Sequence, residues 1–378
     1  MRPTIGILGS YGGLNIGDEA ILTCIVECLR EARPAAELVV FSRRPEHTVE
    51  RHRVDRVVPW RGVSREDVLP DIERLDLLVL GGGGILYDGE ARHYMRAVIS
   101  AQQRGIATYG YATGAGPLGD PEDTALVRDG LEGMTAFTVR DEETKLVLED
   151  IGLSRPVEVT ADPAMLLTAG EFTSEMLMRE GVPEHNHLVG MSVREPGRAA
   201  TNLDVDGYHA LLAEAADFIV HRLDAHILFV PMERDDIRRS HAVLSHMVAP
   251  DRARILNGDY DPGQILGLMR HLDFVVGMRL HVLIFAAVSG VPFLPLPYAG
   301  KVFDFARAVG APALTGVTRE AAGPLLAAVD RIWDLRRQQS THIRQRVVEQ
   351  QRRAARAGQA AVDLLDRLDP QSATRTPA

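Results

Sequence analysis

Short apolar runs alternate with longer amphipathic stretches from the start of the chain, and this alternation constrains the fold more than any other feature. The runs are mostly apolar, and entirely so at 77–80, while the stretches between them repeat apolar residues at helical spacing, as at 19–30. Continuous apolar strands separated by helices indicate a parallel sheet that is covered on both faces. In this part of the chain the sequence predicts strands at 4–8, 37–41, 75–80, 107–111, 136–139 and 157–160, and helices at about 19–30, 91–104, 121–131 and 142–151.

A polar stretch without clear periodicity interrupts the alternation and separates two such cycles. A length of 378 residues suits two domains. We therefore expect an α/β protein of two Rossmann-like, doubly wound domains that face each other across a cleft. In the second cycle the sequence predicts strands at 188–193, 226–231, 253–256, 274–276 and 290–296, and a helix at 206–222. The expected domains are 1–168 and 188–335, with a linker at 169–187 and a C-terminal helix with a frayed tail at 336–378.

The charge balance excludes several classes of protein. The formal net charge is −10 and the isoelectric point is about 5.7, whereas a protein that binds the phosphate backbone of nucleic acids needs an extended basic face. The sequence contains no compact set of four zinc ligands, so we expect no metal. No apolar run reaches the roughly 18 residues of a membrane span, and the N-terminus lacks the pattern of a signal peptide. We expect a cytoplasmic protein with no integral membrane segment and no nucleic-acid partner.

Three glycine-rich segments lie at the carboxyl ends of predicted strands, at 9–19, 81–84 and 109–117. Glycines at the carboxyl end of a strand let the backbone approach a ligand, and the helix that follows offers its amide groups to anions. The spacing matches neither a dinucleotide fingerprint nor a P-loop, so a nicotinamide cofactor is not expected. Four successive glycines are more than a tight turn requires, which favours ligand contact over a turn alone. The residues expected at this ligand edge are Gly82, Gly83, Gly84 and Asp88.

Basic side chains also follow predicted strands, although the chain is acidic overall. Arg140 follows a strand in the first half; in the second half Arg279 and His281 flank Leu280 in a strand-to-helix turn, and Lys301 follows the next strand. Such turns carry side chains to the ligand edge of a parallel sheet. For Arg140 the alternative is a surface salt bridge to one of the acidic residues that follow it. Together these cations favour the binding of a small phosphorylated anion.

Several of these segments recur in a defined order in one known family. They are 13–22, which begins Gly13-Leu14-Asn15 and includes Asp18, then 81–84 with Asp88, Val139-Arg140-Asp141, Asp162-Pro163-Ala164, Arg279-Leu280-His281 and Lys301. In this order they resemble the motifs of the polysaccharide pyruvyl transferase family, from about residue 5 to residue 310. Several motifs in order are more specific than any one alone. The family's scaffold is similar to the GT-B glycosyltransferase fold, which agrees with two doubly wound halves.

The resemblance implies a transferase that uses phosphoenolpyruvate as donor and two hydroxyls of one sugar as acceptor. The product is a cyclic pyruvate ketal on a polysaccharide or its precursor, and phosphate is released. Phosphoenolpyruvate is then a co-substrate, and no further cofactor is implied. The N-terminal domain is expected on the acceptor side and the C-terminal domain on the donor side.

The resemblance also implies roles for individual residues. His281 is expected to donate a proton to the donor or to act as the proton partner of its phosphate. Arg279 and Arg140 are expected to hold the carboxylate and phosphate of the donor, and Lys301 to stabilise the departing phosphate. Asp18 either orients an acceptor hydroxyl or caps the first helix, and both roles remain open. The further expected substrate contacts are Leu280, Asn15, Gly82, Gly83, Gly84 and Asp88, while Asp162 with Pro163 is expected to be architectural.

The main alternative function is that of a GT-B glycosyltransferase with a nucleotide-sugar donor, since the same cations suit a diphosphate. One departure from the family concerns the acceptor: Tyr87 stands before Asp88, where members often carry Gln. The acceptor is therefore open, as a free sugar or a lipid-linked saccharide. A lipid-linked acceptor would place the protein at the inner face of the membrane, with the basic C-terminal helix as the contact, although such a helix is more often a packing element. A homo-oligomer is also left open.

Overall fold

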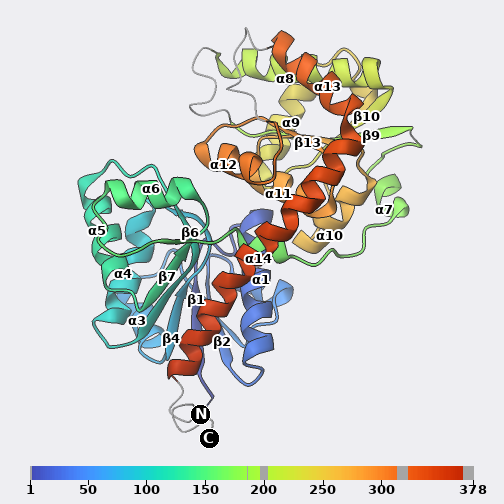
Figure 1. Ribbon diagram of the computed structural model, residues 1–378. Coiled ribbons are helices and arrows are strands. Elements are labelled where there is room, and N and C mark those ends of the chain that lie inside the picture. Colours follow the sequence, from blue (N-terminus) through green and yellow to red (C-terminus); the bar gives the residue numbers. More distant parts are fainter. Residues whose placement is uncertain (1, 185, 196–202, 313–321, 369–378) are drawn as a thin grey trace, which may run out of the picture. The chain divides into compact units, whose positions relative to one another are not determined.

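The computed structural model describes residues 2–184, 186–195, 203–312 and 322–368. The chain divides into two compact units (Figure 1). Unit 1 comprises Met1–Leu167 together with Gln351–Ala378, and unit 2 comprises Thr168–Gln350. The tail at 370–378, expected to be frayed, lies outside the described residues.

Unit 1 is built on an eight-stranded parallel sheet. The strand order is β3-β2-β1-β4-β6-β7-β8, and β5 pairs with β6. The chain thus starts in the middle of the sheet, winds to one edge and returns to build the other, which is the order of a doubly wound fold. The strands are β1 (Thr4–Leu8), β2 (Glu37–Ser42), β3 (Arg56–Pro59), β4 (Leu77–Leu80), β5 (Gly83–Leu86), β6 (Ala107–Ala115), β7 (Ala136–Val139) and β8 (Glu158–Val159).

Two strands of this sheet have no counterpart in the sequence prediction. β3 is an edge strand with an arginine at one end and a proline at the other, so it shows no apolar run. β5 begins within the glycine run that the sequence suggested as a loop: Gly83 pairs with Thr113 and Gly84 with Gly114. Glycine is unfavourable in strands, and here tertiary packing overrides that preference.

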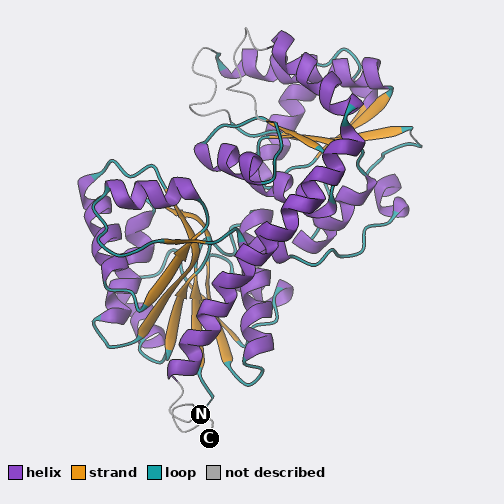
Figure 2. Cartoon of the chain, viewed as in Figure 1, coloured by secondary structure: helices purple, strands orange, loops and turns teal. Residues whose placement is uncertain are grey.

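Helices cover both faces of the unit 1 sheet (Figures 1 and 2). On one face, α4 and α5 pack over a core that includes Leu78, Tyr94 and Val127. On the other face lie α1 and the C-terminal part of α14, where the Tyr109 hydroxyl donates to the Ala357 carbonyl at 2.7 Å. The helices are α1 (Ile16–Ala32), α2 (Pro45–Arg51), α3 (Arg65–Ile72), α4 (Ala91–Gln102), α5 (Pro121–Glu132), α6 (Glu142–Asp150) and the end of α14 (Arg336–Leu368).

Unit 2 repeats the pattern with a five-stranded parallel sheet in the order β11-β10-β9-β12-β13. The strands are β9 (His187–Ser192), β10 (Ala225–Phe229), β11 (Ala253–Ile255), β12 (Phe274–Gly277) and β13 (Phe293–Pro295). α8 and α13 cover the face that carries Val189, Ile227 and Phe274, while α11 packs against β12 and β13 and contacts α10. The helices are α7 (Ser174–Arg179), α8 (Val205–Leu223), α9 (Arg234–His246), α10 (Pro262–Leu268), α11 (Leu280–Ser289), α12 (Gly300–Ala308), α13 (Ala322–Asp334) and the first part of α14.

The protein is therefore an α/β protein with two Rossmann-like units. The segment 169–187 contains α7, a short helix that begins after its cap Thr173. Gly170 in this segment donates its amide to the Gly263 carbonyl at 2.8 Å, which joins it to the start of α10. None of the helices in the described ranges is long and apolar enough to cross a membrane.

Candidate functional site

The first glycine segment of unit 1 surrounds a tyrosine. Tyr11 is fully buried, and its ring accounts for two of the glycines at the carboxyl edge of the sheet. A Cβ at Gly9 would lie 2.6 Å from the Tyr11 ring, and a Cβ at Gly81 would lie 1.8 Å from the Tyr11 hydroxyl oxygen. Within the described residues that hydroxyl has no hydrogen-bond partner. These two glycines make room for a side chain of the protein itself.

Gly12 is explained by the neighbouring strand. Its φ is +68°, and a Cβ would lie 2.2 Å from Ser42 Oγ and 2.7 Å from the Arg44 amide nitrogen. The Gly12 amide donates to a buried carboxylate oxygen of Glu19 at 2.8 Å, and the other oxygen of Glu19 is 2.9 Å from His52 Nε2. The loop is thus held by internal groups that the sequence analysis did not identify.

In the second glycine segment, 81–84, the glycines differ in burial and in what surrounds them. Gly82 is buried, and a Cβ there would lie 3.2 Å from Ile21 and from the Tyr111 carbonyl oxygen. Gly83 is also buried with a φ of +99°, and a Cβ would lie 3.4 Å from Asp18 Oδ1. Gly84 is exposed at the start of β5. Packing therefore accounts for Gly82, whereas Gly83 and Gly84 keep their predicted role at a ligand edge.

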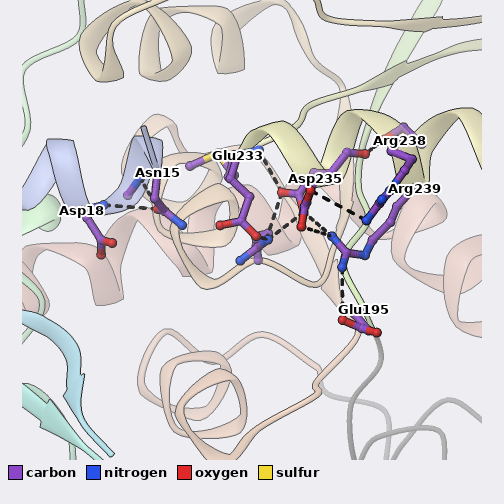
Figure 3. Close-up of polar contacts among 12 residues, drawn as sticks. Asn15, Asp18, Glu195, Glu233, Asp235, Arg238 and Arg239 are labelled. Carbon is purple, nitrogen blue, oxygen red and sulfur yellow. Dashed lines mark hydrogen bonds and ion pairs between the residues drawn. The ribbon is translucent and has the colours of Figure 1, made fainter. Parts of the chain in front are cut away.

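Asn15, and not Asp18, caps the first helix. The Asn15 Oδ1 atom accepts the amides of Gly17 at 2.9 Å and Asp18 at 3.3 Å (Figure 3). Asp18 lies in the first turn of α1, where its charge is favourable at the positive end of the helix dipole. Of the two roles left open for Asp18, the helix cap is therefore wrong, and contact with an acceptor hydroxyl stays a prediction.

Asp88 organises a loop. It is exposed, and its carboxylate accepts the amide of Gly119 at 2.9 and 3.0 Å and the amide of Asp120 at 3.0 Å. Tyr87 beside it is 39% exposed. Burial of part of the Tyr87 ring, together with the charge of Glu90, raises the pKa of its hydroxyl. The loop that follows β5 thus presents Tyr87 outward while Asp88 fixes its shape.

Arg140 occupies an interior position rather than a surface one. Only 5% of its side chain is exposed; its Nε is 2.9 Å from Asp141 Oδ2 and its Nη1 is 3.3 Å from Asp162 Oδ2. Burial alone would lower the pKa of Arg140, but the two carboxylates outweigh it and the pKa is raised. Gly114 leaves space for the guanidinium, since a Cβ there would lie 2.7 Å from Nη2. The ion pair to Asp141 that the alternative predicted is present, but it is buried and shared with Asp162 rather than at the surface. Donor binding by Arg140 stays a prediction.

In unit 2 the strand-to-helix turn after β12 carries Arg279 as the N-cap residue of α11. Its side chain is 12% exposed and makes a two-pronged contact with Asp236, from Nε to Oδ2 at 3.0 Å and from Nη2 to Oδ1 at 2.7 Å. Nη2 also contacts Glu233. Figure 3 shows Glu233 together with Asp235, Arg238, Arg239 and Glu195. Burial would lower the pKa of Arg279, but Asp236 and Glu233 outweigh it and raise the pKa. The guanidinium is therefore fixed in orientation.

His281 and Lys301 open the two helices that follow the last strands of the unit 2 sheet. His281 is the second residue of α11 and is half-buried, while Leu280 between it and Arg279 is 5% exposed and packs inside. Lys301 is the second residue of α12 and is also half-buried. Its Nζ lies 5.5 Å from the centre of the Tyr298 ring. Of the residues predicted in this half, Leu280 is the one that faces the core.

Tyr298 links several cations in unit 2, and two of the residues involved were missed from the sequence. The guanidinium carbon of Arg194 lies 3.9 Å from the centre of the Tyr298 ring. Burial would raise the pKa of the Tyr298 hydroxyl, but Lys301, Arg194 and Arg279 outweigh it and lower the pKa. A signal was present, since Arg194 comes two residues after β9 as Arg279 comes two residues after β12. The carboxyl edge of this sheet thus gathers Arg194, Arg279 and Lys301 at one tyrosine.

Comparison of the sequence with models of known protein families gives a match. The family model described as polysaccharide pyruvyl transferase matches residues 15–300, which is most of the chain. No curated protein matches the sequence significantly.

Solved structures with the same fold cover nearly the whole chain. They include S. aureus MnaA with UDP (11% identity, TM-score 0.69, covering 100% of this chain and 99% of that one). The UDP-GlcNAc 2-epimerase from Neisseria meningitidis bound to UDP-GlcNAc is 10% identical, with a TM-score of 0.63 over 97% and 99% of the two chains. Anabaena HepE (Alr3699) with UDP-glucose is 13% identical, with a TM-score of 0.62 over 97% and 100%. At such identities the likeness shows the fold alone, a GT-B fold of two Rossmann-like domains.

Proposed function

The chain belongs to the polysaccharide pyruvyl transferase family, a family of transferases, and from this premise we propose that phosphoenolpyruvate is its donor. The reaction moves the pyruvyl group onto two hydroxyls of one sugar in a polysaccharide or its precursor. It forms a cyclic ketal and releases inorganic phosphate. The acceptor is a sugar or a lipid-linked saccharide.

The observation that carries the proposal is the cationic carboxyl edge of the unit 2 sheet. Arg279, His281 and Lys301 all lie at the start of helices that follow strands β12 and β13. Phosphoenolpyruvate is a compact ester with a planar carboxylate and a phosphate, and guanidinium and ammonium groups suit these anions. In a chain with a net charge of −10, such a gathering of cations favours one local anion rather than a polyanion.

The chemistry requires a proton donor at the methylene carbon. We assign this role to His281, because imidazole exchanges protons near neutral pH. Protonation of C3 makes C2 electrophilic, and the first sugar hydroxyl then adds to C2 as it loses its proton to a base. The second hydroxyl forms the other C–O bond while the bond from C2 to the phosphate oxygen breaks, and the proton of this hydroxyl passes to the departing phosphate. Lys301 and Arg279 stabilise the negative charge that grows on the leaving phosphate.

For the acceptor we keep the assignment to unit 1. Asp18 is the carboxylate that we propose to orient a hydroxyl or take its proton. Asn15 holds the turn that presents Asp18, through the amides of Gly17 and Asp18. Gly84 and Tyr87 are the exposed residues of the β5 region, which makes them candidates for sugar contact.

The test compares donors on the purified full-length chain. Phosphoenolpyruvate and several nucleotide sugars are titrated separately, with the melting temperature and calorimetric heat as readouts. Our proposal expects saturable binding of phosphoenolpyruvate, and at 100 times Kd a stabilisation of about 2.7 kcal/mol. Binding of a nucleotide sugar with no response to phosphoenolpyruvate would instead establish the glycosyltransferase alternative.

A further inference from the structure

Arg194 follows β9 and stacks on Tyr298. A separation of 3.9 Å between the guanidinium carbon and the ring centre is a close cation–π contact, which holds the guanidinium over the face of the ring. Tyr298 is itself packed against the core formed by α8, α13 and the sheet. Arg194 is therefore positioned by a rigid platform rather than by a flexible surface contact.

Arg194 makes no ion pair with a carboxylate of the described residues, and neither does Lys301. The Arg194 Nε is enclosed by protein, and among the described residues it has no hydrogen-bond partner. Arg279 differs, because Asp236 and Glu233 already offset its charge.

The electrostatics of Tyr298 agree with an excess of positive charge here. Burial of the Tyr298 hydroxyl favours its neutral form, yet Lys301 and Arg194 shift its pKa downward. The local field therefore favours an anion at the carboxyl edge of β9 and β13. Neither cation forms an ion pair with an acidic side chain of the described residues, which agrees with an anionic ligand at this edge.

We propose that Arg194, held over the Tyr298 ring, binds the carboxylate of the donor, while Lys301 binds its phosphate. The proposal rests on the proposed function, because it names residues for the same donor. A planar guanidinium matches a planar carboxylate with two parallel hydrogen bonds, whereas an ammonium acts as a point charge suited to phosphate. Arg194 is thus a donor-binding residue additional to those predicted from the sequence.

The experiment measures two ligands by calorimetry on the full-length protein: phosphoenolpyruvate and inorganic phosphate. The variants are Arg194→Gln and Arg194→Lys. The matched control is Arg270→Gln, which removes one exposed charge of unit 2 on the segment that precedes β12, at the opposite edge of the sheet. We expect the Kd for phosphoenolpyruvate to rise about 10- to 100-fold in both Arg194 variants. The Kd for inorganic phosphate should stay within about threefold, and the control should change neither.

Two further variants separate packing from binding. Tyr298→Phe keeps the ring under Arg194 but removes the hydroxyl that accepts a hydrogen bond from Lys301, so it should weaken phosphoenolpyruvate binding less than Tyr298→Leu does. Tyr298→Leu removes the stacking surface and should weaken binding about as much as Arg194→Lys does. Far-ultraviolet circular dichroism and melting temperatures check that each variant is folded.

The outcomes distinguish the two proposals. Unchanged phosphoenolpyruvate affinity in the Arg194 variants overturns this inference and leaves the proposed function standing. Equal weakening of both ligands shows a general charge effect and also overturns the assignment of the carboxylate. Failure of the parent protein to bind phosphoenolpyruvate overturns the proposed function and this inference with it.

Discussion

Replacement of Arg140 by methionine tests how unit 1 is held together. Methionine fills much of the same space, but it leaves Asp141 and Asp162 in the interior without their shared cation. Removing one partner of a buried ion pair costs about 3–5 kcal/mol. The hydrogen bonds from Thr144 to Asp141 and from Ala164 to Asp162 remain, so we expect the lower half of that range.

The pH dependence makes this prediction specific. In the parent protein burial acts to raise the pKa of Asp141, but Arg140 and Thr144 outweigh it and hold the pKa below its usual value. This contribution to stability is present above the unfolded pKa of about 3.9 and is lost as the pH falls through the lowered value. In Arg140→Met burial acts without the cation, so the pKa of Asp141 rises above that of the unfolded chain. The variant then takes up a proton on folding. The difference in free energy of unfolding between the parent and the variant therefore narrows by about 1.4 kcal/mol for each pH unit below the raised pKa.

The assay is urea denaturation at pH 7.5, 6.5, 5.5 and 4.5, followed by circular dichroism for both proteins. Arg128→Met serves as the matched control, because Arg128 of the same unit makes an exposed ion pair with Asp129 that is worth less than about 1 kcal/mol. A deficit that stays constant across this pH range would refute the reasoning, as would a deficit no larger than that of the control.

Three further predictions concern residues at or near the carboxyl ends of the strands in the two sheets. His281→Ala should lower kcat by about 10²- to 10⁴-fold in an assay of phosphate release from phosphoenolpyruvate with acceptor, and an unchanged kcat removes the histidine from proton transfer. Asp236→Asn should raise the KM for the donor and lower the free energy of unfolding by about 1–3 kcal/mol. The reason is that Arg279 loses a charged two-pronged partner while Glu233 remains. A KM for the donor equal to that of the parent protein would show that Asp236 is structural only. Gly81→Ala should cost about 1–3 kcal/mol or more in urea denaturation, because its Cβ would lie 1.8 Å from a tyrosine oxygen.

Much of the fold follows from the hydrophobic pattern. Strands buried on both faces show as continuous apolar runs, and β1 at Thr4–Leu8 and β7 at Ala136–Val139 have the bounds that the pattern predicts. The pattern fails for strands that are not formed by a continuous apolar run. β3 is an edge strand with one face half exposed, and β5 begins with glycines that only its pairing with β6 orders.

The site is predictable in part for a similar reason. Residues at strand-to-helix turns can be located from the sequence once the strands are known, which places Arg279, His281 and Lys301 at the carboxyl edge. Side-chain partners cannot be located in this way, because Arg279 meets Asp236 from a different strand-to-helix connection, 43 residues away. The same limit hid the stacking of Arg194 on Tyr298.

The glycines show most clearly what the sequence cannot predict. A glycine indicates that a side chain does not fit at its position, but it does not indicate which group occupies the space. The sequence favoured a ligand beside the 81–84 run, yet at Gly81 the space is taken by Tyr11. The two explanations differ in an observable way. If Tyr11 is the obstacle, Tyr11→Phe should partly rescue Gly81→Ala, because it removes the oxygen at 1.8 Å and leaves the ring carbon Cζ at 2.9 Å. If the space belongs to a ligand, removing the hydroxyl changes nothing in the stability of the unliganded alanine variant, and the two substitutions are additive.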